Sequence, residues 1–227
     1  MIVAHPVAAP CPAASVAAHL PLRPGDPGVR VDLDGNGTRD RVVIRYAPRA
    51  PARCAFFLVY ELAGRSPLAV RLPPGDPQED SNIASEAVRT WDEPHVALVA
   101  HVRPGMLDTV VRMGHGASVS IDELFGSVRG ALKPLLAYDV GGFAAGGTWS
   151  WGCARHGRVA KRWVGPTQWN GKTYKSNGYW ETTYAFRDGR YTEVAKHGDA
   201  AISAKRSGDL YSHWLFSGWD GFGNCAV

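Results

Sequence analysis

The stretch Val31–Tyr46, VDLDGNGTRDRVVIRY, combines an acidic loop with an apolar run, and it is the clearest indication of fold and chemistry in the chain. Four oxygen-bearing side chains stand at relative positions 1, 3, 5 and 9, with glycines among them: Asp32, Asp34, Asn36 and Asp40. Glycine permits the positive φ of a tightly wound loop, so alternate side chains can converge on one point. Oxygen ligands at this spacing suit a hard cation. We expect Ca²⁺ before Mg²⁺, with the Thr38 carbonyl as a further ligand.

The acidic loop differs from an EF-hand, because position 12 is Val43 rather than a bidentate Glu and no amphipathic helix follows. Residues 41–46 form instead a β-branched run that predicts a strand. Loop and strand together resemble the FG-GAP/VCBS family of integrin-α-type calcium-loop repeats, in a single copy. The resemblance implies an extracellular, propeller-like β-protein of the kind that bacteria secrete, with Ca²⁺ bound in the loop.

Four cysteines lie far apart in the chain: Cys11, Cys54, Cys153 and Cys225. They lack the C-x-x-C pairs of zinc and redox sites. Beside a loop suited to extracellular calcium, they predict two disulfides formed in an oxidising compartment. Three pairings are possible. Because chain ends commonly lie close together in compact domains, we pair Cys11 with Cys225 and leave Cys54 with Cys153.

The N-terminal residues 1–30 are rich in Ala and Pro, and we interpret them as a flexible segment. They lack the charged region and continuous apolar core of a secretory signal, so an exported chain would have lost its signal. No run of 18 apolar residues occurs in the sequence, so no transmembrane segment is expected. We expect a secreted or cell-surface protein.

Short strand patterns separated by turn residues predict an all-β, antiparallel fold, either propeller-like or a sandwich. The predicted strands cover residues 55–62, 68–72, 95–102, 107–113, 118–125 and 131–138. The first is almost wholly apolar and is expected inside the protein. Pro134 weakens the last strand or puts it on a sheet edge. Residues 81–91 predict a short amphipathic helix capped by Ser81. For residues 120–128 a helix is the alternative to a strand.

The composition changes after residue 138, where glycines 141, 142, 146 and 147 predict a flexible joint and seven of the eight tryptophans follow. We divide the chain into a β lobe with the acidic loop, 31–138, and a Trp-rich β lobe, 139–227, or treat 31–227 as one domain. The best hairpin joins 179–187 to 190–194 through Asp188-Gly189, a type I′ turn signal. It sets Phe186 opposite Tyr191.

The Trp-rich lobe is basic. Residues 151–227 hold 11 Lys+Arg and 6 Asp+Glu, against 14 and 15 in residues 1–150. Cations among aromatics suit an extracellular glycan or protein partner, whereas no nucleic-acid-binding motif appears. We predict Trp151 in the core and Trp169 exposed in a loop at 165–171. The candidate ligand-binding residues are Trp169, His115 in a glycine-flanked turn, Arg158 and Arg162.

Catalytic motifs are missing: the sequence has no G-x-S-x-G, no H-E-x-x-H and no P-loop. Carboxylates for glycoside hydrolysis would come from Asp92, Glu93, Asp122, Glu123 or Glu181. We therefore predict an exported, calcium-binding all-β protein with a structural or recognition role. The alternatives are a secreted carbohydrate-active hydrolase and a glycan- or protein-binding module that uses the Trp-rich lobe.

Overall fold

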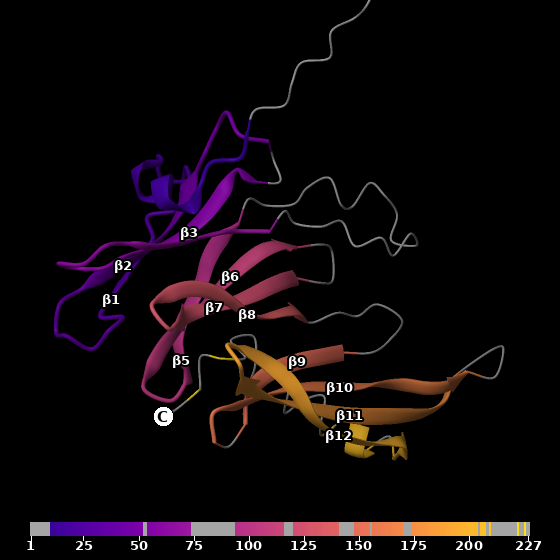
Figure 1. Ribbon diagram of the computed structural model, residues 1–227. Helices are drawn as coiled ribbons and strands as arrows, with labels where there is room; N and C mark the ends of the chain where they lie inside the picture. Colours follow the sequence, from indigo (N-terminus) through magenta and orange to yellow (C-terminus); the bar gives the residue numbers. More distant parts are fainter. Residues whose placement is uncertain are drawn as a thin grey trace, which may run out of the picture.

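The computed structural model describes residues 10–51, 54–73, 94–115, 120–140, 148–154, 156–169, 174–203, 205–207, 209, 222 and 225. They form three antiparallel four-stranded sheets, each a meander of consecutive strands (Figure 1). The prediction of an all-β, antiparallel fold is confirmed. The strands of the described residues do not close into a propeller ring; the three sheets lie in layers instead.

Sheet A contains the acidic loop and has the order β1-β2-β3-β4, with strands Val29–Val31, Asp40–Tyr46, Phe56–Glu61 and Leu68–Arg71. The four residues between the ends of β3 are buried, as its apolar sequence predicts. A short 3₁₀ helix, η1 (Ala14–His19), covers one face of this sheet, where Ala17 packs with Val43, Phe57 and Val59. Part of the segment predicted to be flexible therefore belongs to the core.

Sheet B is the middle layer and has the order β5-β6-β7-β8, with strands His95–Arg103, Met106–His115, Ser120–Val128 and Ala131–Val140. The helical alternative for 120–128 was wrong, because that segment pairs with β6 on one side and β8 on the other. Pro134 does lie on an edge strand, opposite Phe125 at a register shift, and edge strands and bulges are the places where a sheet tolerates proline.

Sheet C has the order β12-β11-β10-β9, with strands Thr148–Ala154, Arg158–Trp169, Tyr174–Arg187 and Arg190–Ile202 for β9 to β12. The predicted β11–β12 hairpin is confirmed. Asp188 and Gly189 both have positive φ, 51° and 88°, as a type I′ turn requires. Phe186 lies opposite Tyr191, with the two rings edge to face at 5.6 Å.

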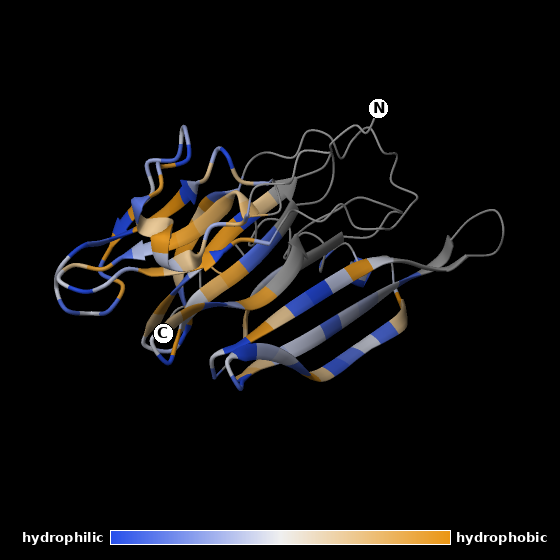
Figure 2. Cartoon of the chain, turned by 45° about the horizontal axis from the view of Figure 1, so that its top comes forward, coloured by the Kyte–Doolittle hydropathy of each residue, from blue (hydrophilic) through white to orange (hydrophobic). Residues whose placement is uncertain are grey.

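Two cores hold the three layers together, one on each face of sheet B. Val111 and Phe125 point to sheet A and pack with Ile44, Leu58 and Tyr60. Their neighbours in sequence, Val110 and Leu124, point the other way and pack with residues of sheet C: Trp151, Val159 and Tyr191. Figure 2 shows apolar residues concentrated in sheets A and B, whereas the strands of sheet C alternate between hydrophilic and apolar residues.

A buried ion pair lies between sheets B and C. The Asp108 carboxylate is fully buried and accepts hydrogen bonds from the Arg103 guanidinium, one of them 2.6 Å long. Arg103 also donates to the Ser127 carbonyl and lies over the Phe186 ring at 4.9 Å. Burial raises the pKa of Asp108, and the bonds and charge of Arg103 oppose that rise. A Cβ on Gly126 would stand 2.2 Å from an Asp108 oxygen, so this pair requires glycine there.

The two disulfides expected from the cysteine count are present, but the predicted pairing was wrong. Cys11 is bonded to Cys54, and Cys153 to Cys225. Cys11 precedes η1, which packs on sheet A, and Cys54 precedes β3 of the same sheet, whereas Cys225 belongs to the core between sheets B and C. Cys11 and Cys225 are thus held by different sheets, which is why they are not bonded to each other.

Some predictions fall on residues outside the described ranges, namely the helix at 81–91 and the glycine joint at 141–147. Among the described residues, no helix has the length and apolar character needed to cross a membrane.

Candidate functional site

The acidic loop, residues 32–40, joins β1 to β2 and is wound by its own side chains. Asp32 accepts the backbone N–H of Asn36 at 3.0 Å and that of Gly37 at 2.7 Å. Asn36 accepts the N–H of Thr38 at 2.7 Å. Gly35 and Gly37 both have positive φ, 71° and 81°, which permits this winding. The loop conformation expected from the sequence is therefore present.

The carboxylates of Asp32, Asp34 and Asp40 converge, and one oxygen from each lies within 4.8 Å of the others. Two oxygens bound to a single Ca²⁺ at about 2.3–2.6 Å are separated by at most about 5 Å, so this cluster fits one such ion. Asp40 is buried at the start of β2 and accepts the N–H groups of Leu33 and Ala63. It ties the loop to the turn between β3 and β4.

Among the described residues, Arg65 forms an ion pair with this cluster of three aspartates. Its Nη1 lies 3.0 Å from an Asp34 oxygen, and its side chain is mostly exposed. Asp32, Asp34 and Arg65 also line a depression of about 490 Å³, together with Tyr60, His101 and Met106. The loop therefore faces the junction of sheets A and B. A cation bound there would compete with Arg65 for Asp34.

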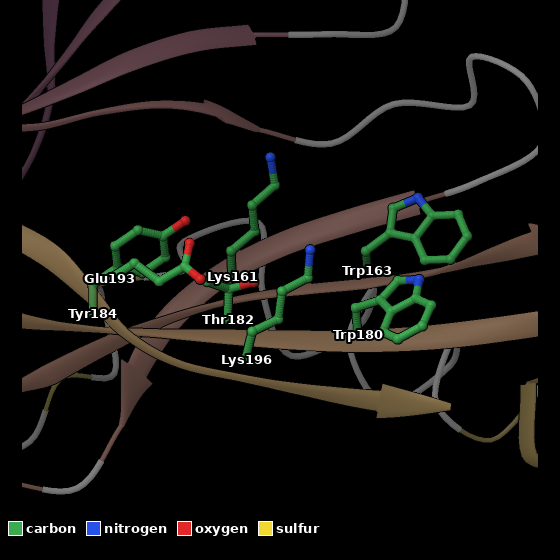
Figure 3. A pocket seen from close by; sticks show the side chains of 7 residues that line it. All are labelled: Lys161, Trp163, Trp180, Thr182, Tyr184, Glu193 and Lys196. Carbon is green, nitrogen blue, oxygen red and sulfur yellow. The ribbon is translucent and has the colours of Figure 1, made fainter. Parts of the chain in front are cut away.

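A second candidate site lies on sheet C, where aromatic and charged side chains share one face of three adjacent strands. We call it the aromatic face, and it encloses a depression of about 450 Å³ (Figure 3). Its lining residues are Lys161, Trp163, Trp180, Thr182, Tyr184, Glu193 and Lys196. The strand register explains this grouping, because Lys161 lies opposite Thr182, Trp163 opposite Trp180, and Tyr184 opposite Glu193.

No protein-family model, curated protein or solved structure matches this chain.

Two of the predicted ligand-binding residues, Arg158 and Arg162, do not line the depression of the aromatic face. Arg162 lies between Lys161 and Trp163 on β10, so its side chain points to the opposite face, where it pairs with Glu181 at 2.8 Å. Arg158 is an exposed residue at the start of β10. Trp151 is buried in the core, as predicted.

Two of the predicted binding residues are in strands rather than loops. The loop predicted at 165–171 was wrong in its first part, since β10 continues to Trp169, which lies opposite Tyr174. His115 ends β6 opposite Ser120 and is not in a turn. Pairing with a long neighbouring strand overrides the glycine and proline signals in both segments. The side chains of His115 and Trp169 are outside the described part of the structure.

Sequence reasoning missed Trp180, Lys196 and Glu193 as site residues. The signal was available for part of the site, because the confirmed hairpin alternates Trp180, Thr182 and Tyr184 on one face. The contribution of β12 could not be read in this way. Register shifts in the β11–β12 pairing move Glu193 and Lys196 into positions that uniform alternation does not give.

Two of the carboxylates considered for hydrolysis are engaged in separate ion pairs. Asp122 pairs with Arg112 at 3.0 Å and Glu181 pairs with Arg162. Asp92 and Glu93 are outside the described residues. Glu123 is buried on β7 opposite Val111, and burial raises its pKa from 4.5 to about 7. No arrangement of two opposed carboxylates emerges from the described residues.

Proposed function

We propose that this chain is an exported, calcium-binding all-β protein in which the acidic loop holds Ca²⁺ as a structural ion and sheet C acts in recognition. The convergence of Asp32, Asp34 and Asp40 within 4.8 Å carries the first part of the proposal. The likeness of the loop and β2 to the FG-GAP/VCBS repeats agrees with it. The two disulfides are consistent with an extracellular protein.

A structural role for the ion follows from charge. Three carboxylates held this close repel one another, and Arg65 offsets the charge of Asp34 from a largely exposed position. A divalent cation would remove the repulsion. Because Asp40 also holds the turn after β3, the ion would fasten the β1–β2 loop to the rest of sheet A. Asn36 and the Thr38 carbonyl are the further ligands that we propose.

Thermal unfolding with and without calcium tests this proposal. A ligand present at about 100 times its Kd stabilises the native state by about 2.7 kcal/mol. For a chain of this size, the corresponding rise in Tm is roughly 5–10 °C. We expect millimolar Ca²⁺ to produce such a rise and EDTA to reverse it. Asp34→Ala should abolish the calcium effect, whereas Asp199→Ala, at an exposed position on β12, should preserve it. Identical melting curves in calcium and EDTA would refute the calcium site.

The recognition role is carried by the aromatic face. A depression lined by three aromatic side chains and two lysines has the size and the mixture of apolar and polar groups of a ligand site. Tyr184 also packs at the edge of the core between sheets B and C, whereas Trp163 and Trp180 are not part of that core.

A further inference from the structure

One face of sheet C has two parts, a part that packs against sheet B and, farther along the strands, the aromatic face. Trp151, Val159 and Tyr191 are on the face that packs against sheet B. Trp163 and Trp180 are on the same face of β10 and β11, farther along the strands, and are only half-buried. Figure 1 shows β10 and β11 running past the strands of sheet B. The aromatic face is therefore the continuation of a core-forming face into a region where none of the described strands of sheet B is stacked on it.

The position of Trp180 is fixed by the backbone of β12. Gly198 lies opposite Trp180, and a Cβ added there would be 2.3 Å from the Trp180 ring and 2.1 Å from the Tyr179 carbonyl oxygen. The indole therefore lies directly against a strand that has no side chain at this point. Ordered aromatic rings bind with a smaller entropy cost than mobile ones, so this contact prepares Trp180 as a stacking surface.

Two positive charges flank the aromatic rings. Lys196 Nζ lies 6.0 Å from the centre of the Trp180 ring, and Lys161 Nζ lies 5.7 Å from that of Trp151. Figure 3 shows both ammonium groups directed away from the sheet, over the depression, with Trp163 and Trp180 together at one end and Glu193 with Tyr184 at the other. Lysine provides a strongly hydrated point charge that suits a carboxylate or sulfate.

The mixture of aromatic and charged groups on the aromatic face favours a sugar over a nucleic acid. Indole faces stack on flat, weakly polar surfaces such as the C–H face of a pyranose or a nucleobase. Glu193 distinguishes these two ligands, because its carboxylate accepts hydrogen bonds, and a pyranose presents several hydroxyl donors around its ring whereas a nucleobase presents few donors. The two lysines in turn favour an acidic sugar over a neutral one.

From these observations we infer that the aromatic face binds an anionic oligosaccharide, with pyranose rings on Trp163 and Trp180 and acidic groups at Lys161 and Lys196. This inference rests on the recognition role proposed above and names its ligand class. It does not depend on the calcium site. The acidic group is a uronic carboxylate or a sulfate ester; both present negatively charged oxygens, and the probes below distinguish them.

The test is a titration of the full, oxidised chain with four probes, in which tryptophan fluorescence and calorimetry measure the binding. The probes are tetragalacturonate for carboxylates, a heparin-derived tetrasaccharide for sulfates, neutral cellotetraose, and an oligothymidylate of matched charge. We expect at least one acidic sugar to bind at least about tenfold more tightly than cellotetraose and the oligothymidylate, with affinity that falls as salt rises.

The variants are Trp180→Ala, Lys196→Glu and, as a matched control, Lys133→Ala, an exposed lysine on β8. Each of the first two should weaken acidic-sugar binding about tenfold or more, and the control should leave it unchanged. Lys196 is exposed, so its variant tests the site even if Trp180→Ala does not fold. Absence of acidic-sugar binding, tighter binding of the oligothymidylate, or equal binding by Lys196→Glu would overturn the inference. Calcium melting on the same preparation separates this failure from failure of the calcium site.

Discussion

Glu123 gives the sharpest prediction about stability, because it is an acid buried in the central layer. It lies on β7, a strand paired on both sides, on the face of sheet B that packs against sheet A. Within the described part of the chain, no side chain pairs with its carboxylate. Burial raises its pKa from 4.5 to about 7, which means that the folded protein favours the protonated form.

The sign of the pH dependence follows from that rise. Below about pH 4.5 the carboxyl is protonated in both the folded and the unfolded chain, and it imposes no penalty. As the pH rises toward 7, Glu123 ionises in the unfolded chain but stays protonated in the folded chain, so the folded protein loses stability. The loss is complete above the folded-state pKa. At about 1.4 kcal/mol for each pH unit, the difference between 4.5 and about 7 amounts to about 3 kcal/mol.

Glu123→Gln removes this titration while keeping the size of the side chain. We expect urea unfolding to give nearly equal free energies for the two proteins at about pH 4 and a variant more stable by about 3 kcal/mol at about pH 8.5. Glu193→Gln, at an exposed position on β12, is the matched control and should give the same difference at both pH values. A Glu123→Gln effect that is independent of pH would refute the assignment of Glu123 as a buried acid.

The other predictions concern the loop, the disulfides and the buried ion pair. Arg65→Ala removes a positive charge 3.0 Å from Asp34 and should raise calcium affinity about three- to tenfold by calorimetry, whereas unchanged affinity would place the ion away from Asp34. Peptide mapping without reduction should recover Cys11 with Cys54 and Cys153 with Cys225, and any crossed peptide would contradict the layered fold. Asp108→Ala leaves the Arg103 charge buried and unpaired, so chemical denaturation should show a loss of about 3–5 kcal/mol; a loss below about 1 kcal/mol would mean that water reaches this pair.

The predictions that succeeded were those that depend on short-range chemistry. Asp188-Gly189 specified its turn because few residues adopt positive φ easily, and the turn then fixed Phe186 opposite Tyr191. The winding of the acidic loop was readable for the same reason, since Asp32 and Asn36 bond to backbone N–H groups within five residues. Period-two alternation and apolar runs located most of the strands of sheets A and B.

The sequence by itself therefore determined the all-β class, the main hairpin, the acidic loop and the presence of two disulfides. Tertiary structure alone decided the disulfide pairing. Cys11 is bonded to Cys54 beside sheet A, whereas Cys225 lies in the core between sheets B and C, and no local sequence pattern indicates this separation. It also decided which basic residues reach the aromatic face. Arg162 and Lys161 are neighbours with the same charge, yet strand pairing turns one toward Glu181 and the other toward the depression. Which face of sheet C is covered depends on how the three sheets stack. Stacking joins segments that are far apart in the sequence, so no local pattern predicts it.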